Sequence, residues 1–111
     1  MKIKSLSNEK KPFDIKEWND EIKAFVKPIN GFERLVFNDF FVTFYNAQID
    51  YETRFDAGFR AALLVLVKED DTPLFEESDR DAVRNGSFLP LFRMFNEVLN
   101  AEETLETTKK N

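Results

Sequence analysis

The clearest pattern in the chain is a helical stripe of hydrophobic residues within positions 85–100. The stripe recurs at spacings of three and four: Phe88, Leu91, Phe92, Phe95, Val98 and Leu99. Asn85-Gly86 is a break signal, Ser87 is a suitable N-cap, and Pro90 falls in the first turn, where its missing N–H costs nothing. The pattern predicts an amphipathic core helix and by itself indicates no function.

A second helix is predicted to begin at Gly31, because Asn30 and Glu33 have the spacing of a capping box. One face of this helix collects Phe32, Leu35, Val36, Asp39, Phe40, Thr43 and Ala47. A second, adjacent line consists of Phe37, Phe41 and Phe44. A hydrophobic surface this wide predicts either a central helix or a helix that faces a partner chain. Thirteen phenylalanines are many for one small core, so we take the second line as candidate protein-interaction residues.

Two further helices are predicted in the second half of the chain. The first covers 52–68 and is almost wholly apolar in its last two turns, so its end should be buried. An acidic turn at 69–71 and Pro73 then break the chain, and the turn lacks the ligand spacing of a calcium loop. A hydrophobic anchor, Leu74-Phe75, precedes a short acidic helix over 76–84.

The N-terminal half begins with a predicted β-hairpin. Hydrophobic residues alternate between Phe13 and Val26, with a turn near Trp18, and Pro28 ends the pattern. The expected fold is therefore mainly α (α+β): a single small domain of about four helices with a short N-terminal hairpin. Its expected boundaries are a flexible arm at 1–11, the domain at 12–101 and a polar tail at 102–111.

Composition narrows the classes of function. The net charge of −5 and the sequence pI near 4.8 disfavour a surface for nucleic acid. The chain contains neither cysteine nor histidine, so a thiol nucleophile, the usual general base and the commonest metal ligand are missing. We therefore expect no enzymatic activity, no cofactor and no metal. No apolar run is long enough to span a bilayer and no signal peptide is visible, so we expect a cytoplasmic protein.

The order of segments from 12 to 100 carries a more specific signal. A strand pair with Trp18 at its turn leads into the capped helix, and an apolar helix leads into the acidic turn and Pro73-Leu74-Phe75. The last helix closes with Val98-Leu99-Asn100. In this order the segments resemble the tail assembly chaperones of long-tailed bacteriophages. The chain departs from that family where Asn19 and Thr72 stand in place of common glycines, and in its density of phenylalanine.

The resemblance implies a non-enzymatic assembly factor of the infected host cell, absent from the mature virion. Such proteins bind the tape measure protein, keep it soluble until tail tube subunits assemble around it, and associate with themselves. In many of them a translational frameshift adds a domain that recruits tail tube protein. The end of the chain, Lys109-Lys110-Asn111, fits either a slippery adenine run or an ordinary polar terminus.

Two other classes stay open at this point. One is a small acidic helical adaptor or inhibitor that binds a host or phage protein, for example by mimicking nucleic acid. Lysine and arginine are interspersed among the acids, which counts against mimicry. The other is a structural protein of the virion, such as a tail completion subunit.

Overall fold

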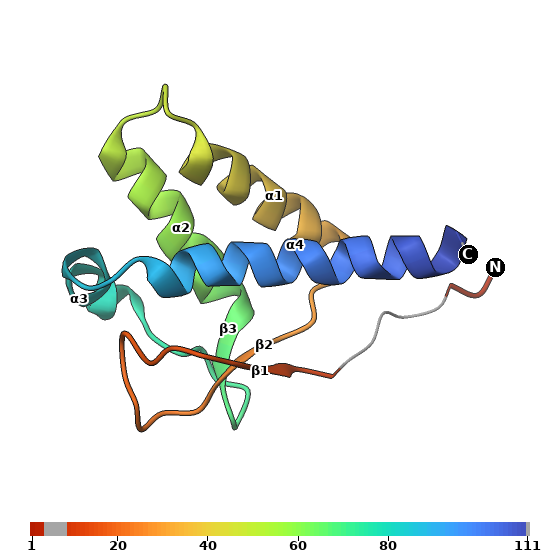
Figure 1. The fold of residues 1–111 in the computed structure, drawn as a ribbon, viewed down its shortest axis with the longest axis horizontal. Coiled ribbons are helices and arrows are strands. Elements are labelled where there is room, and N and C mark those ends of the chain that lie inside the picture. Colours follow the sequence, from red (N-terminus) through yellow and green to blue (C-terminus); the bar gives the residue numbers. More distant parts are fainter. Residues whose placement is uncertain (4–8, 111) are drawn as a thin grey trace.

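The computed structural model describes residues 1–3 and 9–110, and for 101–110 the backbone alone. The described elements follow in the order β1 (Lys11–Phe13), β2 (Ala24–Val26), α1 (Gly31–Tyr45), α2 (Tyr51–Val65), β3 (Leu66–Lys68), the 3-10 turn η1 (Glu77–Asp79), α3 (Arg80–Asn85) and α4 (Leu89–Lys110). The predicted class, mainly helical with an N-terminal hairpin, is confirmed. In Figure 1, α1 and α2 form a pair, α4 lies across it, and the small sheet lies below.

Both long helices of this pair begin at side-chain caps. The capping box predicted for α1 is confirmed: Asn30 Oδ1 accepts from Glu33 N at 2.8 Å, and Glu33 Oε1 accepts from Asn30 N at 3.0 Å. α2 begins after Asp50, whose carboxylate accepts from Thr53 N at 2.8 Å. The hydrophobic face predicted for α1 included Ala47, but the helix ends at Tyr45, so Ala47 lies outside it.

The helix predicted over 52–68 is wrong at its end. α2 stops at Val65, and Leu66–Lys68 forms the strand β3, which pairs antiparallel with β2 so that Val67 lies opposite Phe25. An apolar run of this kind suits a helix or a strand equally well. The strand forms because β2 has a second edge whose backbone groups need partners.

The arm predicted over 1–11 is partly attached, and residues 4–8 of it lie outside the described residues. Lys10 Nζ lies 2.7 Å from Asp71 Oδ1 in the acidic turn, and 4.8 Å from the centroid of the Phe25 ring. Asp71 has a φ of 70°, a left-handed conformation that Asp tolerates better than most residues. The tail predicted from 102 continues α4 to Lys110.

The larger of two hydrophobic clusters joins α1, α2 and α4. Phe95 of α4 is fully buried and its ring packs against several rings of α1, with centroid distances of 5.2 Å to Phe37 and 5.0 Å to Phe44. Leu91, Phe95 and Val98 of the predicted stripe are therefore core residues, whereas Phe92 is 40% exposed and its assignment to the core is corrected. This cluster fixes which side of α1 faces inward.

A smaller cluster joins α2 to the segment before α4. Phe59 of α2 stacks on Phe75 at 5.3 Å, and Phe75 meets the edge of Trp18 at 5.8 Å. Phe75 is thus the anchor that the sequence indicated. Trp18 Nε1 also donates to the carbonyl of Ser87 at 2.7 Å, so the hairpin loop is attached to the start of α4.

The N-terminal hairpin is held to α4 by an ion pair as well. Arg93 donates to both carboxylate oxygens of Glu17, at 3.0 and 2.7 Å. The hydrogen bond from Arg93 lowers the pKa of Glu17 to about 2, so this carboxylate stays ionised well into the acidic range. At the helix start, Ser87 Oγ accepts from Leu89 N at 3.1 Å, as the sequence predicted.

Gly58 permits the close approach of α1 and α2. A Cβ at this position would lie 2.6 Å from two carbon atoms of the Phe44 ring. Real side chains do not tolerate such a distance, so the ring of α1 packs directly on the backbone of α2.

We expect Gly58→Ala to destabilise the fold by about 1–3 kcal/mol, because the added methyl group must displace a buried ring. The measurement is chemical denaturation followed by circular dichroism. Gly31→Ala is the matched control, since nothing lies within 4 Å of a Cβ there, and it should cost no stability. Equal stability of the two variants would contradict the packing described for Gly58.

Candidate protein-interaction site

The line predicted to bind a partner lies against α4 instead. Phe37 and Phe44 are only 0% and 5% exposed, and Phe41 is partly buried. Phe41 packs on the same ring as its two neighbours, with 5.7 Å between the centroids of Phe41 and Phe95. The three residues are therefore brought together, but Phe37 and Phe44 are core residues and offer no exposed ring. Their assignment to an open interaction surface is corrected accordingly.

The opposite side of α1 exposes hydrophobic side chains to solvent. Phe32, Leu35 and Val42 are 76%, 66% and 61% exposed. With the exposed carboxylate of Asp39 they follow one another at spacings of three, four and three residues. Such spacings place four side chains along one line of a helix. We call these four residues the outer line of α1.

The outer line continues toward the start of α4. Tyr45 and Phe92 are both partly open to solvent, and their ring centroids lie 5.9 Å apart. Burial on the other side of the Tyr45 ring raises the pKa of its hydroxyl. Leu89, in the first turn of α4, is also exposed. The hydrophobic surface therefore extends beyond a single helix.

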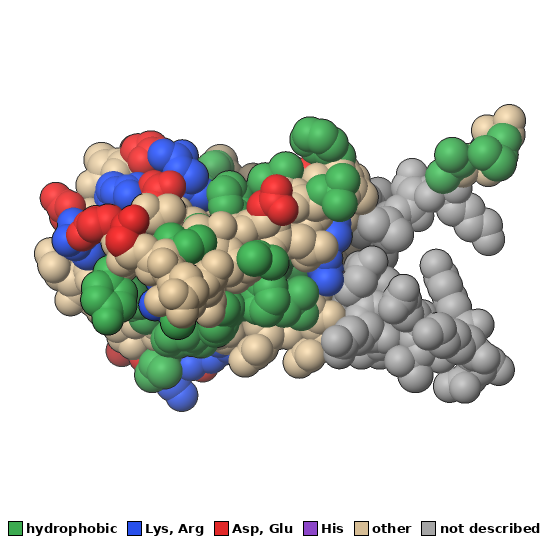
Figure 2. Space-filling model, turned by 90° about the horizontal axis from the view of Figure 1, so that it is seen from above, with side chains coloured by type: hydrophobic (Ala, Val, Ile, Leu, Met, Phe, Trp, Pro, Cys, Tyr) green, Lys and Arg blue, Asp and Glu red, His purple; other side chains and the backbone are tan. Residues whose placement is uncertain are grey.

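Charged side chains are concentrated elsewhere, on α2, η1 and α3. Asp56 pairs with Arg60 of the next turn of α2 at 3.0 Å and with Arg80 of α3 at 2.8 Å. Arg60 reaches Glu77 of η1 at 3.3 Å. Figure 2 shows this contrast: charges gather at the left end of the face seen from above, and hydrophobic side chains gather over its middle and right.

Asp39 differs from these acids because it has no ion pair within the described part of the chain. The only basic residue of α1 is Arg34, and its guanidinium donates to the carbonyl of Val98 at 3.1 Å. Asp39 is therefore a single unpaired carboxylate among exposed hydrophobic side chains.

The sequence contains one local sign that the outer line faces solvent, the charge of Asp39. A charged residue within a hydrophobic helical stripe marks the side that faces solvent, because an unpaired charge is costly to bury. Asp39 stands on the first predicted face of α1, together with Phe32 and Leu35. The part of that face around Phe32, Leu35 and Asp39 is exposed, and Val42 adjoins it, whereas its other helical members, Val36, Phe40 and Thr43, are half-buried.

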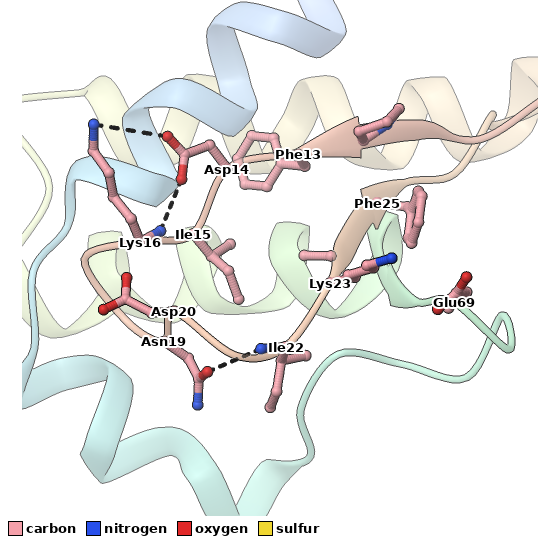
Figure 3. Close-up of a pocket in the computed structure, with 12 residues that line it drawn as sticks. Phe13, Asp14, Ile15, Lys16, Asn19, Asp20, Ile22, Lys23, Phe25 and Glu69 are labelled. Atoms are coloured by element: carbon pink, nitrogen blue, oxygen red, sulfur yellow. Dashed lines mark hydrogen bonds and ion pairs between the residues drawn. The ribbon is translucent and has the colours of Figure 1, made fainter.

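A shallow depression of about 510 Å³ lies beside the hairpin loop. Figure 3 shows two of its polar side chains, Asp14 and Asn19, turned toward neighbouring groups of the loop. Asp14 Oδ1 accepts from the Lys16 amide at 2.9 Å, and Asn19 Oδ1 accepts from the Ile22 amide at 3.0 Å. These groups are used to hold the loop in shape. The depression contains no nucleophile paired with a base.

Among the residues that the structure describes, no group of three histidine, cysteine, aspartate or glutamate side chains is placed to hold a metal ion. Within the same residues, none of the helices has both the length and the apolar character required to cross a membrane. The feature that remains for a functional site is the exposed hydrophobic surface of α1 and the start of α4.

Comparison with known proteins does not identify the candidate site. No protein-family model matches the chain, and neither curated proteins nor solved structures give a match. The assignment of function therefore rests on the residues themselves.

The two sides of α1 should respond differently to truncation. Phe37→Ala should cost about 3–5 kcal/mol of stability, because it leaves a cavity next to Phe95. Phe32→Ala should change stability by about 0.5 kcal/mol or less, since its ring is mostly in water. Thermal and chemical unfolding of both variants measures the difference. A large loss of stability in Phe32→Ala would contradict the exposed position of that ring.

Proposed function

We propose that this protein is a non-enzymatic tail assembly chaperone of a long-tailed bacteriophage, which binds the tape measure protein and keeps it soluble during tail assembly. The proposal draws on the order of segments from 12 to 100 and on the character of the exposed surface. It places the protein in the host cytoplasm and outside the mature virion.

The observation that carries the proposal is the exposed outer line of α1. Soluble monomeric proteins rarely expose contiguous apolar patches without using them. Eleven of the thirteen phenylalanines are buried or partly buried, so the fold can shield most of its phenylalanine side chains from solvent. Phe32 is nevertheless 76% exposed. A surface of this kind suits a client helix, which binds through hydrophobic side chains spaced by three or four residues.

Self-association and recruitment of tail tube protein belong to the same proposal. Tyr45 and Phe92, beside the outer line, provide further exposed aromatic surface for a second copy. A longer product made by frameshifting near the end of the chain would add a domain for the tube protein. The nucleotide sequence around the codons of Lys109 and Lys110 tests that part, because slippage requires a run of adenines.

Nucleic-acid mimicry by an acidic adaptor is less well supported. A mimic needs a face of unpaired acids, whereas Glu52, Asp56 and Glu77 each pair with an arginine. The exposed hydrophobic line also has no counterpart on a nucleic-acid backbone.

Co-expression with the large helical protein encoded just downstream tests the function. We expect the chain to raise the soluble fraction of that tape measure protein and to co-purify with it. Leu35→Ser should weaken co-purification by about tenfold or more, because central hydrophobic contacts contribute about 2 kcal/mol or more. Circular dichroism of the purified variant establishes that it is folded.

Tyr51→Ser is the matched control for this experiment. Tyr51 is 84% exposed at the start of α2 and is not part of the outer line, so its loss should leave co-purification unchanged. A folded wild-type chain that leaves the tape measure protein insoluble would contradict the proposed function.

A further inference from the structure

We infer that the outer line of α1 receives about three turns of a client helix, and that this helix places a lysine or arginine opposite Asp39. The inference rests on the proposed function and deepens it, since it states which segment of the tape measure protein is recognised. It follows from the spacing of four residues and from the charge of one of them.

The spacing specifies the form of the partner. Phe32, Leu35, Asp39 and Val42 occupy the successive a and d positions of a heptad pattern. The line from Phe32 to Val42 is about 15 Å long, at 1.5 Å per residue. A helix packed along it buries about three turns, with its own hydrophobic residues at spacings of three and four.

The charge specifies what that helix must carry. Asp39 is exposed in the free chain and its carboxylate is hydrated at no cost. A helix laid over Phe32, Leu35 and Val42 necessarily covers the carboxylate between them. Removing an unpaired charge from water costs several kcal/mol unless a cation replaces the solvent. A polar residue at one such position also fixes the register of the two helices.

A second copy of this chain is disfavoured as the occupant by the same charge. In a two-fold pairing of α1 with itself, both Asp39 carboxylates enter one apolar seam. Arg34, the basic residue of this helix, donates to the carbonyl of Val98 and so is not placed to neutralise them. Like charges that are buried together repel, so a partner with a basic residue fits the surface better.

Site-specific photo-crosslinking tests the occupant. A photoreactive phenylalanine analogue replaces Leu35 in the full chain, which is co-expressed with the tape measure protein. We expect a crosslink to one amphipathic segment of that protein with a lysine or arginine within its hydrophobic stripe. The analogue at Ser78, exposed on η1, is the control position and should give no such crosslink.

A charge reversal then tests the role of Asp39. Asp39→Lys should weaken capture of the tape measure protein by about tenfold or more, and changing the basic client residue to Glu should restore capture by this variant. Asp20→Lys makes the same change of charge in the exposed hairpin loop and should have no effect. The two reversals together exclude a general effect of net charge.

The remaining outcomes separate the inference from the proposed function. Co-purification without a crosslink from position 35, a crosslinked segment with no basic residue, or undiminished capture by Asp39→Lys would overturn the inference alone. A crosslink to a second copy of the chain would show that this face is a self-interface and would also overturn it. Failure of the wild-type chain to co-purify with the tape measure protein would overturn both.

Discussion

The fold depends on the contact between the Phe44 ring and the backbone of Gly58. Because Gly58 has no Cβ, α1 and α2 approach closely enough for Phe44 to remain in contact with Phe95 of α4. Phe37 of the same helix is also buried and packs on Phe95. With that side of α1 fixed, the outer line is left facing solvent. The exposed hydrophobic surface is therefore a consequence of how the core packs.

The division of charge follows from the same arrangement. Arginines and acids that lie on neighbouring turns of α2, η1 and α3 neutralise one another in pairs such as Asp56 with Arg80. α1 takes no part in that network, and Asp39 on its outer side has no ion pair with any residue that the structure describes. Charged side chains thus gather at one end of the molecule, where several of them form ion pairs, while Asp39 lies among exposed hydrophobic side chains.

Local features of the fold were predictable from the sequence because their partners are close along the chain. The capping box at Asn30 and Glu33 needs only residues three apart, and the cap at Ser87 likewise acts within one turn. Non-local features were not predictable. Leu66–Lys68 becomes a strand only because β2 lies beside it, although the two are about forty residues apart in the sequence. The side chain of Lys10 is held by a turn whose proximity the sequence does not indicate.

The exposed side of α1 was likewise not predictable, because it depends on contacts that are distant in the sequence. Periodicity showed two hydrophobic lines on α1, but deciding which line faces inward required the position of Phe95, far along the chain. The unpaired carboxylate of Asp39 was the one local sign of the exposed line. Hydrophobic spacing alone therefore identified the helix that carries the exposed line, but it did not show that Phe37 and Phe44 face the core.

Hydroxyl-radical footprinting tests the central claim most directly, because it measures the solvent access of individual side chains in the free chain and in its complex with the tape measure protein. The account predicts that Phe32, Leu35 and Val42 react readily in the free chain and are protected in the complex, while Tyr51 reacts equally in both. Unchanged reactivity of the outer line in the complex, or protection of Tyr51 instead, would contradict it.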